Sequence, residues 1–268
     1  MDHVFQGGGW IVWPVVLAMH FFMLRKLDAG VPQAWWRWVH AGGVWLIVLL
    51  GGNLLVYSVG QAQLWQTAWA SVMLLVSGTL VLLLLSARPW WHGPQSWPVD
   101  RFARAYLWRA AAPLAVLVAL GALAVAVHSS GNAKPLPYVP LLNPTDLAIA
   151  LGIGACAMWL MRLHTSALQV PAVARSRGPL LAVAALGFIA VNTVWLRVVH
   201  HFAGVAWDAG TLFSSFLVQA GYSILWTLIA VALMVTAHRR AQRGMWTVGA
   251  ALIGLTVVKL FIIDLSNR

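Results

Sequence analysis

Glutamate is missing from this sequence, cysteine occurs once, and charged residues are scarce. All six acidic residues are aspartates, so the paired-glutamate and Glu-x-x-His arrangements of glycosidases, bundle metalloenzymes and zincins are absent. The single Cys156 excludes a disulfide framework and a cysteine-rich zinc site. The sequence also lacks a Gly-x-x-x-x-Gly-Lys-[Ser/Thr] phosphate loop and a Gly-x-Ser-x-Gly nucleophile elbow. We therefore expect no cofactor, and whether the protein is an enzyme stays open.

Hydrophobic residues dominate the composition. They make up 61% of the chain, charged residues make up 9%, and the mean hydropathy is +0.81. Soluble domains have about 45–50% apolar and about 25% charged residues, so the composition indicates an integral membrane protein. The net charge of +11 comes from basic residues that occur singly and in pairs between apolar runs. This distribution is not a nucleic-acid-binding patch, and no nucleic-acid partner is expected.

Eight segments are long and apolar enough to cross a bilayer, which takes about 20 residues of helix. They predict an all-α, polytopic transmembrane helix bundle, with residues 1–268 forming a single bundle. The predicted spans are 8–24, 39–58, 65–86, 110–128, 146–163, 180–199, 212–237 and 245–265.

Basic residues alternate between the connections and predict the orientation. Thirteen of the 17 lie in the connections after the first, third, fifth and seventh spans, and by the positive-inside rule that side is cytoplasmic. Both termini are then extracytoplasmic, which is typical of a portion of a longer multi-spanning chain. The thirteen are Arg25, Lys26, Arg37, Arg88, Arg101, Arg104, Arg109, Arg162, Arg175, Arg177, Arg239, Arg240 and Arg243.

Two connections are more than short turns. In 99–109 the apolar residues follow helical spacing with arginines opposite, which predicts an interfacial amphipathic helix on the cytoplasmic surface. The segment 129–145 is an outer loop rich in proline. At its end Asn143 can cap a helix that has Pro144 at its first position and Asp146 in its first turn.

Four stretches together resemble the C-terminal part of a large bacterial family of predicted membrane proteins, classed as a domain of unknown function. They are Pro-Leu-Pro-Tyr-Val-Pro-Leu-Leu-Asn-Pro-Thr-Asp (135–146), Arg-Val-Val-His-His (197–201), Gln-Ala-Gly-Tyr-Ser-Ile-Leu-Trp-Thr-Leu (219–228) and Val-Val-Lys-Leu-Phe-Ile-Ile-Asp-Leu-Ser (257–266). The resemblance covers almost the whole chain. It implies a multi-pass protein of the bacterial inner membrane and a longer chain with further spans, and it implies no known reaction.

Polar and ionisable side chains near the outer ends of the spans are the candidate site, because such groups are costly inside a membrane. We expect a polar cap that binds an anionic group or is paired internally, with Asp264 as the simplest partner of Arg197. The predicted cap consists of Arg197, His200, His201, Asn143, Asp146, Gln219, Lys259 and Asp264.

The histidines do not predict a metal site by themselves. His200 and His201 point about 100° apart on a regular helix, so the two cannot bind one ion together. One of them joined by His128, Asp146 or Asp208 could, but no spacing requires it. A bis-histidine haem is formally possible among nine histidines. It would need ligands from opposite halves of the bundle.

Three functions remain open. The leading hypothesis is a module that binds or handles a lipid-linked or cell-envelope ligand through the polar cap, with membrane lipids as partners. The alternatives are a secondary transporter, for which no internal repeat is found, and a noncatalytic structural subunit. Such a subunit would contact the remainder of a longer chain or other envelope membrane proteins.

The orientation predicts which loops are accessible from outside. In a Cys156→Ser background, a membrane-impermeant maleimide should label Ser130→Cys in intact cells and label Ser176→Cys only after lysis. Residue 130 lies in the proline-rich connection and residue 176 lies between two arginines of the basic side. Labelling of Ser176→Cys in intact cells, and of Ser130→Cys only after lysis, would contradict the predicted orientation.

Overall fold

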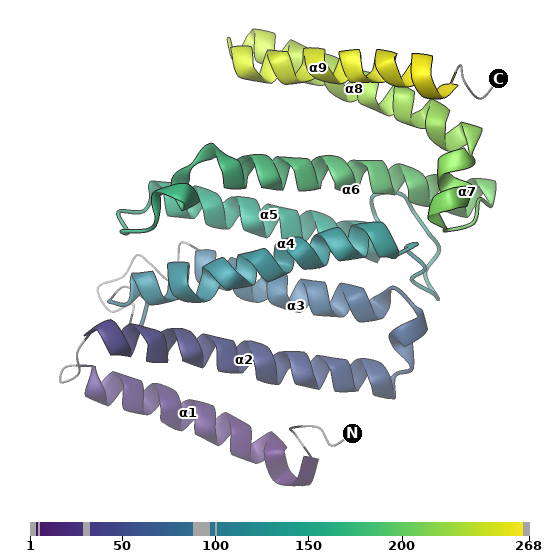
Figure 1. Cartoon of the computed structure of the whole chain (residues 1–268). Coiled ribbons are helices and arrows are strands. Elements are labelled where there is room, and N and C mark those ends of the chain that lie inside the picture. Colours follow the sequence, from purple (N-terminus) through teal and green to yellow (C-terminus); the bar gives the residue numbers. More distant parts are fainter. Residues whose placement is uncertain (1–3, 5, 29–32, 88–96, 100, 265–268) are drawn as a thin grey trace. The chain divides into compact units, whose positions relative to one another are not determined.

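The structure is a computed structural model that describes residues 4, 6–28, 33–87, 97–99 and 101–264, and every regular element within these residues is a helix (Figure 1). Eight of the helical segments are long and apolar enough to span a membrane, which confirms the predicted number. The eight are Gln6–Leu27, Ala34–Gln61, Trp69–Ser86, Ala105–His128, Pro144–Thr165, Arg177–Ala203, Phe216–Arg239 and Arg243–Ile262. The sides on which the termini lie stay a prediction.

The helices follow the predicted spans within a few residues. Short 3-10 turns lie at Gln6–Gly8, Leu64–Gln66 and Ala172–Arg175, and π-helical turns lie at Ala105–Ala110 and Leu260–Asp264. The α-helices are α1 (Gly9–Leu27), α2 (Gln33–Gln61), α3 (Trp69–Ser86), α4 (Ala111–His128), α5 (Pro144–Thr165), α6 (Arg177–Ala203), α7 (Ala209–Ser214), α8 (Phe216–Arg239) and α9 (Arg243–Lys259).

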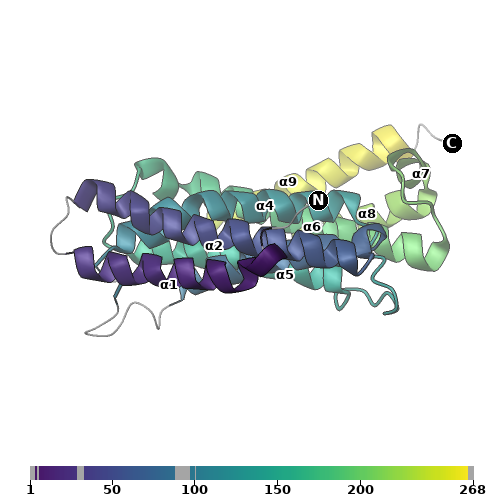
Figure 2. The same ribbon diagram turned by 90° about the horizontal axis from the view of Figure 1, so that it is seen from below.

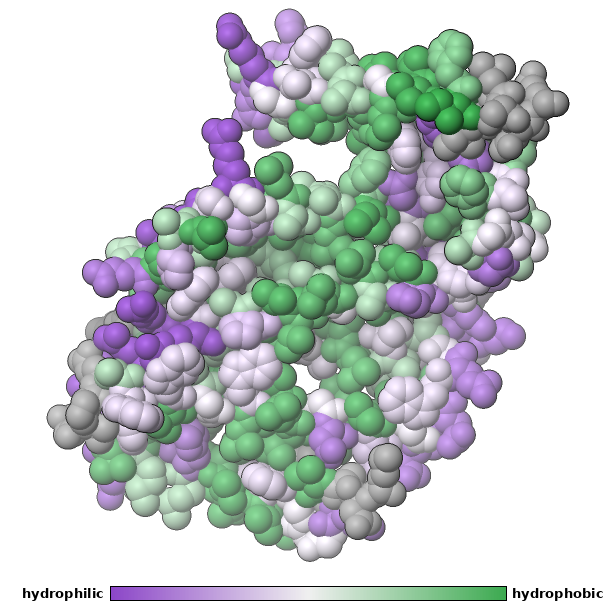
Figure 3. Space-filling view, viewed as in Figure 1, coloured by the Kyte–Doolittle hydropathy of each residue, from purple (hydrophilic) through white to green (hydrophobic). Residues whose placement is uncertain are grey.

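Contacts divide the chain into two compact units, residues 1–190 and 191–268, with the boundary inside α6. Each unit is described by itself, and the predicted single bundle over 1–268 stays a prediction. Figure 3 shows hydrophobic side chains along the lengths of the helices and hydrophilic ones gathered near their ends. This distribution is the one that a lipid environment favours.

In the first unit α1 to α5 run alongside one another in both ribbon views (Figures 1 and 2). Its core lies where α3, α4 and α5 pack together, around buried Leu75, Leu82, Val118 and Ile149. Gly152 of α5 faces this core, and a Cβ there would be in ordinary van der Waals contact with Val118 and Leu75, at 3.4 and 3.5 Å. Small residues at such contacts are typical of membrane helices.

The predicted interfacial helix over 99–109 is wrong as a separate element. Residues 97–99 and 101–102 form turns, and the chain is helical from Ala103 through the π-helical stretch Ala105–Ala110 into α4. The apolar side of this segment is real, but it packs on protein, because Phe102 and Tyr106 are buried against α2. The sequence pattern shows that this segment has an apolar face, but it does not show whether lipid or protein covers that face.

The predicted start of the fifth span is confirmed. The Asn143 side-chain oxygen Oδ1 accepts a hydrogen bond from the Thr145 backbone amide at 2.9 Å, Pro144 begins α5, and Asp146 lies in the first turn. Residues 129–143 form no regular element, as the prolines require.

In the second unit, helices α8 and α9 pack along their lengths and two glycines permit close contacts. A Cβ at Gly221 would lie 2.1 Å from the Trp195 ring. A Cβ at Gly249 would lie 2.7 Å from the Met234 side chain and 2.9 Å from the Ala230 carbonyl oxygen. Gly221 therefore permits the close contact of α8 with Trp195 of α6, and Gly249 permits that of α9 with α8.

Gly249→Ala should weaken the pairing of α8 and α9, because the new methyl group meets backbone that cannot move away. We expect a loss of about 1–3 kcal/mol in the free energy of unfolding, measured as a lower thermal midpoint in lipid nanodiscs. Gly254→Ala is the matched control, since a Cβ at Gly254 meets nothing within 4 Å. An equal loss in both variants would contradict the packing.

Candidate functional site

Arg197 of the predicted cap is completely buried in the second unit. One guanidinium nitrogen donates to the Thr193 hydroxyl at 3.4 Å, and the guanidinium carbon lies 5.9 Å from the centre of the Trp207 ring. The hydroxyl belongs to the preceding turn of α6 and the ring to the following loop. The side chain is therefore enclosed by protein and ties the end of α6 to that loop.

Lys259 and Gln219 of the predicted cap lie together. The Lys259 ammonium donates to the Gln219 backbone carbonyl at 2.9 Å and to the Ser223 hydroxyl at 3.0 Å. The Gln219 amide donates in turn to the Phe213 carbonyl at 2.8 Å. The face of α8 that holds Gln219 and Ser223 thus binds α9, which agrees with the interhelical role of such stripes.

The two histidines do not face a common point. The His200 Nδ1 donates to the Val205 carbonyl oxygen at 2.7 Å, and its ring lies at 72° to that of His201 with the centres 4.8 Å apart. In the part of the chain that the structure describes, no three His, Cys or Asp side chains gather into a metal site. His200 therefore serves the turn after α6.

Asn143 and Asp146 lie in the first unit and organise the proline-rich loop. The Asn143 amide donates to the Gly131 carbonyl at 3.0 Å, and the Asp146 carboxylate accepts from the Tyr138 hydroxyl and from the Leu141 amide at 3.3 and 3.2 Å. Leu141 has a φ of 66°, a conformation that Asp146 holds in place. Asp264 ends the last π-helical turn, and its side chain lies outside the described residues. The assembly of all eight residues into one cap stays a prediction.

Sequence reasoning missed a buried cluster around Asp28, directly after α1. Its carboxylate accepts hydrogen bonds from the Trp36 and Trp97 indoles and lies 3.2 Å from the His40 Nε2. The His40 Nδ1 is 2.9 Å from the Tyr106 hydroxyl, and its ring stacks on Phe102 with the centres 4.0 Å apart. The cluster joins α1, α2 and the start of the fourth span.

A signal for this cluster was present in the sequence. Asp28 is one of only six acids, Trp36 and His40 are four residues apart, and so are Phe102 and Tyr106. Side chains four apart share a helix face, so both pairs could have been read as contact surfaces. Burial raises the Asp28 pKa, but the hydrogen bonds from Trp97, Trp36 and His40 outweigh burial and leave the pKa below its ordinary value.

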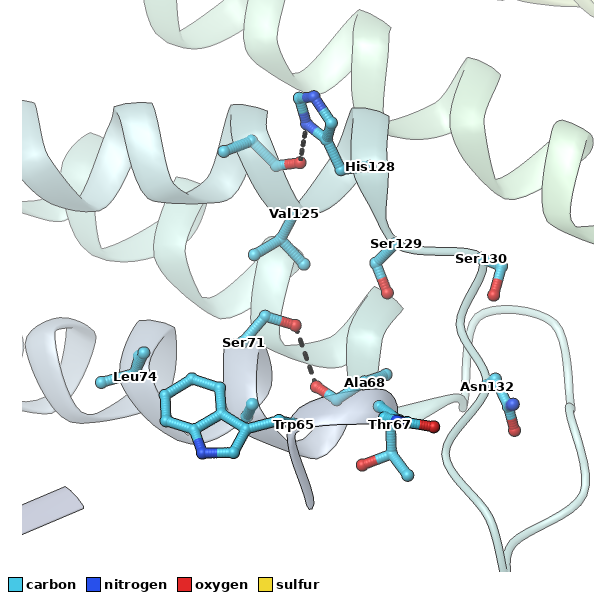
Figure 4. A pocket seen from close by; sticks show the side chains of 13 residues that line it. Trp65, Thr67, Ala68, Ser71, Leu74, Val125, His128, Ser129, Ser130 and Asn132 are labelled. Carbon is cyan, nitrogen blue, oxygen red and sulfur yellow. Dashed lines mark hydrogen bonds between the residues drawn. The ribbon is translucent and has the colours of Figure 1, made fainter. Parts of the chain in front are cut away.

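A cleft between α2, α3 and α4 is the second feature that the sequence did not indicate. It consists of two adjoining cavities of about 520 and 490 Å³ that share Ser71, Leu74, Ala124 and Val125. The first lies at the loop end (Figure 4) and is lined by Trp65, Gln66, Thr67, Ala68, Ala70, Ser71, Leu74, Ala124, Val125, His128, Ser129, Ser130 and Asn132.

The second cavity runs along the helices and is almost entirely apolar. Besides the four shared residues, it is lined by Ile47, Val48, Gly51, Gly52, Leu55, Leu75, Ser77, Gly78, Val81, Leu114, Leu117, Val118 and Gly121. Four glycines on three helices thus replace side chains that would otherwise fill the space. The whole cleft is polar at one end and apolar along its length. This distribution matches that of an amphiphilic molecule, which has a polar head and an apolar chain.

Comparison with known families places the chain. Residues 1–268 match the model of the family described as "Predicted membrane protein (DUF2339)". The chain belongs to this family. No curated protein and no solved structure shows a significant match to it. Membership of DUF2339 confirms the resemblance seen in the four sequence stretches and a multi-pass membrane protein, and it assigns no activity.

We expect the Asp28 cluster to make the stability of this DUF2339 protein depend on pH. Because the folded-state pKa of Asp28 is depressed, its contribution is present above the unfolded pKa of about 3.9 and is lost as the pH falls below that value. Asp28→Asn should lower the free energy of unfolding at pH 7 by about 1–3 kcal/mol and flatten the decline between about pH 5 and pH 3. Thermal midpoints across this range are the measurement.

Asp208→Asn is the control for this prediction. The Asp208 carboxylate caps α7 by accepting from the Thr211 amide at 2.8 Å, and an asparagine oxygen can accept the same bond. Its midpoint at pH 7 should stay close to that of the unaltered protein. An Asp28→Asn variant as stable as the Asp208→Asn control would refute a stabilising role for the cluster.

Proposed function

We propose that this protein is a membrane-embedded module that binds a lipid or a lipid-linked ligand, with the apolar chain in the cleft between α2, α3 and α4. The observation that carries the proposal is that a cavity with a polar lining adjoins an apolar one and shares four lining residues with it. Ligand sites in proteins are commonly mostly apolar clefts of about 300–1,000 Å³ with a few polar groups. Both cavities lie within that range.

The depth of the apolar cavity supports a chain from one leaflet. Its lining on α3 extends from Ser71 to Val81 and on α4 from Leu114 to Val125. Ten or so residues of helix rise about 15 Å, and the hydrocarbon core of a bilayer is about 30 Å thick. The cavity thus has the length of one leaflet.

The two glycines on α2 support the proposal because they leave space without a packing role of their own. A Cβ at Gly51 or Gly52 would meet nothing within 4 Å, although both residues lie in the wall of the cleft. Glycine in a helix interior costs about 1 kcal/mol relative to alanine. Because the two glycines lower helix stability and the space beside them stays open, the cleft is better explained as a binding site than as a packing defect.

The predicted cap around Arg197 adds no direct support for ligand binding. Lys259, Gln219 and His200 already form hydrogen bonds with protein groups. In the orientation predicted from the basic loops, the polar end of the cleft faces the outer leaflet of a bacterial inner membrane. Both the orientation and the membrane belong to the proposal.

Filling the cleft should abolish binding of the chain. We expect Gly52→Phe to reduce labelling by a lipid with a photoactivatable diazirine in its acyl chain by about tenfold, since the ring occupies the apolar cavity. The measurement is the yield of labelled peptides from 71–81 and 114–125 in nanodiscs.

Gly42→Phe is the matched control for this test. Gly42 lies on the same helix, a Cβ there also meets nothing within 4 Å, and the residue is not part of the cleft. Labelling should remain unchanged in this variant. Equal labelling of all three proteins would contradict the proposed function, and so would labelling spread evenly over the exposed surfaces of the helices.

A further inference from the structure

We infer that the cleft selects an uncharged, polyhydroxylated headgroup, so that its ligand is a glycolipid. This inference rests on the proposed function and adds the chemical class of the ligand. A lipid chain leaves one hydrocarbon environment for another when it enters the cleft, so its burial gives little selectivity. The choice among ligands therefore falls to the polar end.

Apart from His128, the polar side chains at the polar end are neutral hydrogen-bonding groups. None of the thirteen residues that line this cavity is Lys, Arg, Asp or Glu. A phosphate or carboxylate headgroup is bound best by guanidinium or ammonium groups, with charge-assisted hydrogen bonds about twice as strong as neutral ones. The lining lacks those groups and holds amides and hydroxyls.

Three of the lining side chains keep their hydrogen-bonding groups available. The indole nitrogen of Trp65 and the amides of Gln66 and Asn132 bond to none of the residues that the structure describes. An amide donates and accepts at once, and so does a sugar hydroxyl. Two hydroxyls beside them, on Thr67 and Ser71, donate to carbonyls at 2.8 and 2.9 Å. The Thr67 oxygen also accepts from the Trp69 amide at 3.3 Å, and the Ser71 oxygen can accept from a ligand.

Trp65 adds an apolar plane to this polar set. Its side chain is 52% exposed, and its indole nitrogen lies 3.3 Å from the position of a Cβ on Gly60, so glycine at 60 leaves room for the ring. A sugar ring has one or two faces of C–H groups that pack on an aromatic surface, while its hydroxyls point outward to amides. An aromatic ring beside amides and hydroxyls suits a glycosyl group.

The two rims of the cavity are tied together, which fixes the spacing of these groups. The Ala68 amide, at the start of α3, donates to the Asn132 carbonyl at 2.9 Å, and the Trp69 indole donates to the Lys134 carbonyl at 3.0 Å. The turn before α3 carries Trp65 and Gln66, and the loop after α4 carries Asn132. Lys134 itself is exposed and lies outside the lining.

The basic group nearest to this chemistry is His128 at the end of α4. Its Nδ1 donates to the Ala124 carbonyl at 3.0 Å, which Figure 4 shows beside Val125. The whole set thus matches hydroxyl groups better than an anion.

The test is competition against the photoactivatable lipid by amphiphiles that share one alkyl chain and differ in the head. An alkyl glucoside should displace the probe from the unaltered protein at a concentration about tenfold below that of the alkyl phosphate. Trp65→Ala and Asn132→Ala should reduce this ratio to about threefold or less. Trp10→Ala, which removes a 67% exposed tryptophan of α1, should leave the ratio unchanged.

The outcomes separate the two proposals. If the alkyl phosphate competes as well as the glucoside, or better, the headgroup inference is overturned and the lipid-binding function stands. If free glucose competes at the concentration of the glucoside, the ligand is a soluble sugar and the inference of a glycolipid fails. If neither amphiphile displaces the probe and Gly52→Phe has no effect, the proposed function itself fails.

Discussion

Hydrocarbon offers no hydrogen bonds, and this constraint governs the whole molecule. Each helix satisfies its own backbone, and donor side chains reach carbonyl oxygens of other elements. Trp159 donates to the Leu107 carbonyl, within the π-helical turn before α4, at 2.9 Å. Asn143 and Lys259 make the same kind of bond to Gly131 and Gln219. Hydrogen bonds from polar side chains thus hold the elements of an otherwise apolar fold together.

The same constraint separates polar groups that serve the fold from those that can serve a ligand. Lys259 and Asp28 are buried and bonded to neighbouring elements. By contrast, Trp65, Gln66 and Asn132 lie in the wall of a cleft, and the polar groups of their side chains bond to none of the described residues. The side chains best placed to bind a ligand are therefore not the charged ones that stand out in the sequence. They are the uncharged groups in the turn before α3 and in the proline-rich loop after α4.

Local chemistry could be predicted from the sequence, and contacts between distant segments could not. Hydropathy located all eight spans, and Asn143 with Pro144 located the start of α5, because both depend on neighbours in the chain. The segment 99–109 has a true apolar face, but nothing local says that α2 covers it. The Asp28 cluster draws on residues up to 78 positions apart, from Asp28 to Tyr106.

The cleft failed to appear for the same reason. Gly52, Gly78 and Gly121 lie on three helices, and each alone reads as an ordinary small residue of a membrane span. Only their convergence makes a cavity. The predicted cap was conspicuous because an arginine and two histidines are rare in apolar segments. Such residues are rare because they are costly in a membrane, but this does not distinguish a side chain that holds the fold together from one that binds a ligand.

A density map of the protein purified in native lipid tests the central claim most directly. Our account predicts an elongated density between α2, α3 and α4, with its bulkier end beside Trp65 and Asn132. A cleft that is closed by side chains, or one that is empty while ordered lipid covers the outer faces of the helices, would contradict it.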